Sequence, residues 1–123
     1  MAEFIISKTR EAEYFFCLRS GRNEIILSSE IYRLKQAVRN GIHAVRLSAL
    51  NDHRFERKNA QGCYYFVLRS ANGEALGFST TYHALRSREE GIEAVKRTAP
   101  TAEEIDLCSD DILQVEKIQF VNY

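Results

Sequence analysis

Histidine and cysteine are the side chains that most often bind metals or carry out catalysis, and this chain has three of each. They lie far apart in the sequence, at His43, His53, His83, Cys17, Cys63 and Cys108. No arrangement of Ser, His and Asp resembles a hydrolase triad, and no spacing matches a zinc or iron site. No glycine-rich loop leads from a strand into a helix as phosphate binding requires. We therefore expect no catalytic residue, no metal and no cofactor.

The three cysteines favour a structural role. Their number is odd, and no pair has the close Cys-x-x-Cys spacing of redox or metal sites. A nucleophilic Cys17 would need a lowered pKa and access to solvent, and a position inside a strand indicates neither. We interpret all three as reduced thiols, which favours a cytosolic protein.

The strongest pattern is a repeat of fifty residues. The segment 14–20 (YFFCLRS) returns at 64–70 (YYFVLRS), and the match continues without a gap to Ala49 and Ala99. Such a period indicates a tandem duplication. Because fifty residues are too few to bury a large core alone, the two copies, 1–50 and 51–107, should share one core.

Each copy predicts three strands followed by a helix. In the first copy we expect strands at residues 4–6, 14–19 and 24–28, and a helix at 33–49. In the second copy we expect strands at 54–57, 64–69 and 74–78, and a helix at 83–99. Further strands are expected at 103–107 and 113–121. Asn72-Gly73 predicts a two-residue type I′ hairpin turn, and Gly21-Arg22-Asn23 predicts a looser turn in the first copy.

Alternation along the second strand of each copy separates the two faces of the sheet. Tyr14, Phe16 and Leu18 recur identically in the second copy, so we expect them to face the core. An antiparallel sheet with one solvated face would carry polar residues on its other side, and this one does not. We therefore expect that side to be covered, and we treat it as a possible interaction surface made of Phe15, Cys17, Arg19, Tyr65, Val67 and Arg69.

The predicted helices carry apolar residues at spacings of three and four, which form one stripe. Gly41 and Gly91 lie inside these helices, and we expect them to allow close packing rather than to contact a ligand. Arg88 replaces Val38 of the first stripe, which predicts a more exposed end for the second helix.

Polar residues are also repeated at strand ends and before the helices, and two interpretations of them remain open. They could line two symmetry-related pockets. Alternatively, they fix the turns and satisfy the entering helix, which is the more usual role at such positions. The repeated pairs are Glu24/Glu74, Ser29/Ser79 and Tyr32/Tyr82.

Taken together, these motifs resemble the YegP-like family, whose function is unknown. The resemblance rests on Tyr-x-Phe-x-Leu-Arg-Ser, Asn72-Gly73-Glu74 and Gly-Ile-x-Ala-Val, and it covers about residues 4–107. It implies an α+β fold of two tandem β-β-β-α repeats with antiparallel sheets, pseudo-twofold symmetry and exchanged terminal strands. It brings no reaction or cofactor. The chain departs from the family pattern at Leu34 and Ala84, where a capping Ser or Thr is usual, so the cap must come from elsewhere or be absent.

Residues 108–123 extend beyond the usual end of this unit, and we expect a C-terminal extension of β character. We link the extension to the apolar sheet face: the extension, or a second subunit, covers that face. Deleting residues 108–123 should then expose a patch that binds a hydrophobic dye or causes association.

Charge and hydropathy bound the possible partners. Residues 1–50 hold eight Lys or Arg and five Asp or Glu, residues 51–100 hold eight and six, and residues 101–123 hold one and six. The first hundred residues are thus mildly basic and the last segment is acidic. No apolar run approaches the roughly 20 residues that cross a bilayer, and the N-terminal residues do not resemble a signal peptide.

We expect a non-enzymatic cytosolic module that binds a protein partner or assembles with itself. The alternative is a nucleic-acid-binding domain, in which Arg19 and Arg69 contact phosphates while Phe15 and Tyr65 stack on bases. The mild positive charge of the first hundred residues is weak for that role.

Overall fold

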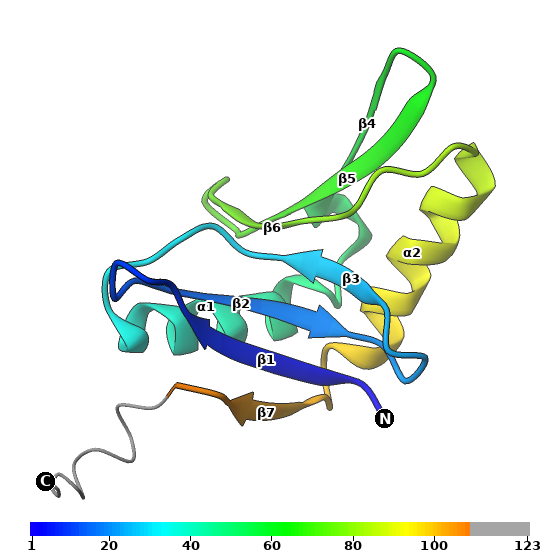
Figure 1. Ribbon diagram of the computed structural model, residues 1–123. Coiled ribbons are helices and arrows are strands. Elements are labelled where there is room, and N and C mark those ends of the chain that lie inside the picture. The colour runs from blue at the N-terminus through cyan, green and yellow to red at the C-terminus, as the bar shows by residue number, and fades with distance from the viewer. Residues whose placement is uncertain (109–123) are drawn as a thin grey trace, which may run out of the picture.

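The structure is a computed structural model that describes residues 1–108 of the 123-residue chain. Over these residues, two β-β-β-α units and the last strand, β7, form one seven-stranded sheet in the order β4-β5-β6-β3-β2-β1-β7 (Figure 1). The elements are β1 (Glu3–Lys8), β2 (Tyr14–Arg19), β3 (Ile25–Ser28), α1 (Lys35–Ser48), η1, a short 3-10 helix (Asp52–Arg54), β4 (Phe55–Ala60), β5 (Cys63–Arg69), β6 (Ala75–Phe78), α2 (Leu85–Thr98) and β7 (Glu103–Asp106). The expected duplicated α+β fold is confirmed.

The hydrophobic core lies between the helices and one face of the sheet. Phe16, Leu18, Phe66 and Leu68 have no exposed surface, as their alternation along β2 and β5 predicts. The helices pack across the two units, because α1 contacts β5 and β6 as well as β2, and α2 contacts β3 as well as β5. Each unit therefore supplies a helix that covers strands of the other unit.

The first strands of the two units do not match at the offset of fifty that holds elsewhere. Phe4 pairs with Leu18, whereas the partner of Leu68 is Phe55, one residue later than an ungapped repeat predicts. The slip arises because five residues (9–13) separate the pair Lys8 and Tyr14, whereas four (60–63) separate the equivalent pair Asn59 and Tyr64. Phe55 thus occupies the place of Phe4.

The two units join at the centre of the sheet, and the last strand crosses from the second unit to the first. β3 pairs with β6 through Ser28 and Phe78. β7 follows α2 but pairs with β1, which is the exchanged terminal strand that the family resemblance implies. This pair is parallel, unlike the antiparallel pairing expected for the sheet, because α2 ends near the edge of the sheet where β1 also begins (Figure 1).

The hairpin turns differ from the prediction. Gly73 N donates to the Ser70 carbonyl at 3.0 Å, and Ser70 N donates to the Glu74 carbonyl at 2.8 Å. The loop therefore has three residues, 71–73, and Gly73 is the one with a positive φ (+89°). The sequence predicts a two-residue type I′ turn at Asn72-Gly73 instead. Asn23, with φ +67°, takes the same place in the first unit, so that turn is not looser. A two-residue turn with two positive φ angles occurs instead at Gln61-Gly62.

Both helices begin without the capping Ser or Thr that is usual in the family, as the sequence indicates. Leu34 and Ala84 precede the helices, and neither helix has a side-chain cap.

Arg88 is 8% exposed, although the sequence predicts a more exposed end of the second helix there. It is buried because its guanidinium donates to the Lys58 carbonyl at 3.2 Å and lies 5.7 Å from the centre of the Tyr64 ring.

The predicted strand at 113–121 lies outside the described residues, as does the covering role predicted for the extension. Of the extension, only Cys108 is described, and it is 4% exposed with its sulfur 3.9 Å from the Ile6 carbonyl. Neither α1 nor α2 is long and apolar enough to cross a membrane.

Candidate functional site

The sheet face opposite the core, here called the outer face, carries a row of mostly apolar side chains. Strand register aligns one residue from each of six neighbouring strands: Ile105, Ile5, Cys17, Ser28, Phe78 and Val67. Ile5 and Val67 are only 6% and 3% exposed, although neither belongs to the core cluster. Phe15 and Tyr65 lie beside the row and are partly buried. The row therefore runs across both units.

Charged groups at the margin of the outer face are paired with each other. Arg19 Nη2 donates to Glu3 Oε1 at 2.5 Å, and Arg69 Nε donates to Glu56 Oε1 at 2.7 Å. Burial raises the pKa of the Cys17 thiol, and Arg19 lowers it only in part, so the neutral thiol is favoured at neutral pH. The six residues of the possible interaction surface lie on this face, three on β2 and three on β5, with β3 and β6 between them.

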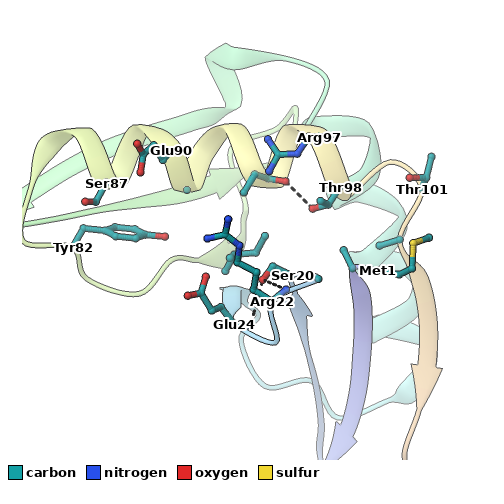
Figure 2. Close-up of a pocket in the computed structure, with 16 residues that line it drawn as sticks. Met1, Ser20, Arg22, Glu24, Tyr82, Ser87, Glu90, Arg97, Thr98 and Thr101 are labelled. Atoms are coloured by element: carbon teal, nitrogen blue, oxygen red, sulfur yellow. Dashed lines mark hydrogen bonds between the residues drawn. The ribbon is translucent and has the colours of Figure 1, made fainter.

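Two grooves lie where the units meet, and the repeat relates one to the other. The α2 groove, of about 800 Å³, lies between α2 and the turn that joins β2 to β3. Figure 2 shows the Tyr82 ring and the Arg22 side chain extending into the space between these two elements, with Glu24 beside the turn. The groove thus combines a helix of the second unit with a turn of the first.

The α1 groove, of about 670 Å³, is built in the same way from α1 and the turn that joins β5 to β6. Both grooves contain a carboxylate, a phenol, a serine, an aliphatic side chain, and a glycine and an alanine on the helix. The matching residues of the α2 and α1 grooves are Glu24/Glu74, Tyr82/Tyr32, Ser20/Ser70, Ile26/Leu76, Gly91/Gly41 and Ala94/Ala44.

Each groove tyrosine lies directly against the glycine of its own helix. A Cβ added to Gly91 would lie 2.9 Å from Tyr82 Cζ and closer still to its hydroxyl. A Cβ added to Gly41 would lie 3.2 Å from Tyr32 Oη and 3.1 Å from the Phe16 ring. The glycines therefore allow close packing, as expected, and the tyrosine is the main partner at Gly91.

Each groove tyrosine also lies near a glutamate of the other unit. Burial raises the pKa of Tyr82, and Glu24 raises it further. Burial also raises the pKa of Tyr32, followed by Glu30 and then by Glu74. Among residues 1–108, neither the two groove carboxylates, Glu24 and Glu74, nor the two phenols have a side-chain hydrogen bond or ion pair. Both phenols therefore stay protonated at neutral pH.

Ser29 and Ser79 have a different role from the other repeated polar residues. Ser29 Oγ accepts from Phe16 N and Ser79 Oγ accepts from Phe66 N, each at 2.9 Å. Both hydroxyls also donate to the next carbonyl, at 2.7 Å. The serines therefore fix the strand ends, whereas the repeated Glu and Tyr line the grooves. The sequence indicated these residues because each polar residue is repeated in the second copy. The repeat does not reveal that each Glu lies near the Tyr of the other copy.

The two grooves carry different charged side chains, and the α2 groove also holds a second carboxylate, Glu90. The α2 groove carries Arg22 and Arg97 where the α1 groove carries Asn72 and Leu47. The one cationic side chain that lines the α1 groove, within the described part of the chain, is Arg54, which donates to Ser48 Oγ at 3.4 Å. Residues 1–108 contain no group of three or more His, Cys, Asp or Glu that could hold a metal ion.

A family model described as a domain of unknown function, DUF1508, matches residues 10–56 and matches again at residues 59–106. The chain belongs to the DUF1508 family. The first match contains β2, β3 and α1 and ends two residues into β4, and the second begins with the last two residues of β4 and contains β5, β6, α2 and β7. The strand β1 lies outside both matches.

Curated relatives of this DUF1508 protein carry no assigned function in their names. The UPF0339 protein YegP of Escherichia coli K12 is 39% identical over 57 residues, which cover 46% of this chain and 52% of YegP. A UPF0339 protein of Acinetobacter baylyi is 42% identical over 52 residues, which cover 42% of this chain and 47% of the relative. The chain thus spans about half the length of the curated relatives that it matches.

Two solved structures share the DUF1508 fold over most of the chain. The solution NMR structure of E. coli yegP, titled a protein of unknown function, has a TM-score of 0.82 and 36% identity, and covers 86% of this chain and 92% of its own. A Shewanella oneidensis UPF0339 protein has a TM-score of 0.84 and 28% identity, and covers 94% and 98%. The YegP-like resemblance inferred from the motifs is confirmed.

Proposed function

We propose that this protein is a non-catalytic module that acts by protein contact through its outer sheet face, and that a second copy of the chain occupies that face. The observation that supports the proposal is the apolar row from Ile105 to Val67, which continues across both units. Ile5 and Val67 are already buried within the chain, so the apolar surface that association would bury comes from the partly exposed Cys17, Phe78 and Ile105.

Charge supports a second copy as the occupant. Arg19 and Arg69 at the margin are each ion-paired to a glutamate, at 2.5 and 2.7 Å. Because these two arginines are already paired, two copies can meet without Arg19 and Arg69 acting as unpaired like charges. We also propose a cytosolic location, which the three free cysteines support.

The same ion pairs weaken the nucleic-acid alternative. Phosphate binding needs concentrated positive charge, and its strength scales with the number of free Lys and Arg contacts. Arg19 and Arg69, the residues assigned to phosphate contact, are instead neutralised by Glu3 and Glu56. We therefore propose protein contact alone.

Light scattering of the full chain, from micromolar to millimolar concentration, tests the proposal. We expect a concentration-dependent dimer, and we expect the double variant Phe15→Lys/Tyr65→Lys to remain monomeric because two charges would be buried without partners. Leu50→Lys is the control, since Leu50 is a large apolar residue that is 71% exposed away from the outer face, and it should still dimerise.

A chain that is monomeric at every concentration would contradict occupation by a second copy. Deletion of residues 109–123 then identifies the cause. If only the shortened chain associates, the chain's own extension competes for the face, and the second copy is the wrong occupant.

A further inference from the structure

The α1 groove has the features of a small-molecule or side-chain binding site that no family description assigns. Its helix side presents Ala44 and, beneath the Tyr32 ring, the buried Gly41. Glu74 and the Tyr32 hydroxyl line the same groove without a hydrogen-bond partner among residues 1–108. Leu47, which is 58% exposed, and Leu76 add apolar walls.

The two groups without partners define the chemistry of a ligand. A carboxylate only accepts hydrogen bonds, and a neutral phenol oxygen also accepts them. A group with several N–H donors can therefore satisfy both, and a positive charge strengthens its bond to the carboxylate. The aliphatic walls would pack against the alkyl chain that carries such a group.

We propose that the α1 groove binds an alkylammonium group, with Glu74 and Tyr32 accepting its hydrogen bonds and Leu47 and Leu76 contacting its alkyl chain. The source is either a lysine side chain of a protein or a free aliphatic amine. This proposal is independent of association through the outer face, because none of these four residues belongs to the apolar row.

The α2 groove is an internal comparison for this site. It repeats the carboxylate and the phenol as Glu24 and Tyr82, but Arg22 and Arg97 also line it. These guanidinium groups repel a cation and compete for the carboxylate. The number of carboxylates that act on each tyrosine also differs. Glu30 and Glu74 both raise the pKa of Tyr32, whereas Glu24 is the one carboxylate that raises the pKa of Tyr82. Glu90 also lines the α2 groove and Arg54 also lines the α1 groove, so the charged side chains balance in both. The difference is that two guanidinium groups line the α2 groove, whereas the one in the α1 groove donates to Ser48.

NMR titration with N-acetyl-lysine N-methylamide tests the proposal on the full chain. We expect saturable shifts of the Gly41 and Ala44 amide signals with a Kd of about 1 mM, because one exposed charge pair and a short alkyl chain give weak binding. The equivalent amides, Gly91 and Ala94, should not shift. N-acetyl-norleucine N-methylamide, which has a similar alkyl chain without the ammonium, should bind at neither groove.

Substitutions separate the contributing groups. Glu74→Gln should weaken binding about tenfold, since it removes a charge-assisted hydrogen bond without changing the shape of the groove. Asn72→Arg, which places in the α1 groove the charge that Arg22 gives the α2 groove, should also weaken it. Glu24→Gln in the α2 groove is the matched control and should leave the Kd unchanged.

The outcomes are decisive in both directions. Equal shifts in the two grooves, unchanged affinity in Glu74→Gln, or binding of the norleucine amide would overturn the proposal. Butylammonium chloride identifies the source. If the lysine amide binds at least tenfold more tightly than butylammonium, the groove recognises a lysine within a peptide. Equal affinity indicates a free amine. Either result requires the ammonium group and supports the site.

Discussion

Tyr82 packs against Gly91, so replacing this glycine by alanine tests the contact with one added methyl group. An alanine inside a helix normally stabilises it by about 1 kcal/mol relative to glycine. At position 91 the added Cβ would lie 2.9 Å from Tyr82 Cζ, which is shorter than ordinary contact. The clash with a rigid ring therefore outweighs the gain in helix propensity.

We predict that Gly91→Ala lowers the free energy of unfolding by about 1–3 kcal/mol, the usual range for overpacking. Urea denaturation measures this change. Gly91→Ala/Tyr82→Phe should recover part of the loss, because it removes the hydroxyl that lies closest to the added methyl group. An unchanged or increased stability in Gly91→Ala alone would show that the ring moves aside freely.

Asp52 predicts a specific acid sensitivity. A hydrogen bond from Lys96 and then one from Arg57 lower the pKa of this carboxyl from 3.8 to about 2. Since the folded-state pKa lies below the unfolded value, the stabilisation is present above about pH 4 and is lost as the pH falls toward 2. It is modest, about 0.2–1 kcal/mol, because the side chain is 54% exposed and solvent screens the ion pairs.

Thermal unfolding from pH 7 to pH 2 tests this prediction. Asp52→Asn should unfold at a lower temperature than the wild type at pH 7, and the difference should disappear near pH 2. Glu11→Gln, a change at an exposed carboxylate in the loop between β1 and β2, serves as the control and should follow the wild type throughout. A constant difference for Asp52→Asn at all pH values would exclude the ion pairs as its cause.

The central strands β3 and β6 show how a duplicated unit becomes asymmetric where its copies meet. Leu27 and Gly77 are equivalent positions in the two units, paired with Leu18 and Leu68. A Cβ added to Gly77 would lie 2.6 Å from Leu27 Cγ, so the junction has room for one large side chain. Glycine in one copy and leucine in the other fill the space that two leucines would overfill.

Exchanging these two residues tests the complementarity of the strands. Gly77→Leu should destabilise the protein by about 1–3 kcal/mol through overpacking, and Leu27→Gly by about 2–5 kcal/mol through the cavity that it leaves. The double variant Leu27→Gly/Gly77→Leu should be more stable than the sum of the two losses predicts, since a leucine again fills the junction. Additive losses in denaturant titrations would mean that the two positions do not share one space.

The protein as a whole is built so that neither unit is complete without the other. Helix α1 covers strands of the second unit, α2 covers a strand of the first, and β7 pairs with β1. Both grooves arise from the same exchange, because each combines a helix from one unit with a turn from the other. Folding of the units and formation of the candidate binding sites are therefore the same event.

We predict that the separate fragments 1–50 and 51–123 are largely unfolded alone and associate when mixed. Circular dichroism and light scattering of each fragment and of the equimolar mixture measure this directly. The mixture should show far more ordered structure than the sum of its parts, as a complex with one copy of each fragment. Two fragments that each fold alone would contradict the shared core.

The fold was largely predictable from residue types and their order. Identical apolar positions such as Phe16 and Phe66 mark the core face of both units, because period-two alternation follows directly from strand geometry. The errors fall where tertiary contacts override local preference. Arg88 is buried because the Lys58 carbonyl and the Tyr64 ring accommodate its guanidinium, and neither partner is near it in the sequence.

The candidate sites were predictable only in part. The residues of the outer face follow from alternation along β2 and β5, so Phe15 and Tyr65 could be assigned to it in advance. The repeated Glu and Tyr were visible in the sequence, but their pairing across the units was not. A periodic pattern describes one copy at a time, whereas a groove depends on how two copies are placed relative to each other.

Residue order alone therefore determined that two copies of one unit exist, which residues each buries and which family they resemble. Only the tertiary structure decided that Glu24 lies near Tyr82 and Glu74 near Tyr32, and that the two resulting grooves carry different charged side chains. The physical reason is that local periodicity depends on backbone geometry, which acts over a few residues. Contacts between units form only when the shared core brings side chains fifty residues apart into the same space.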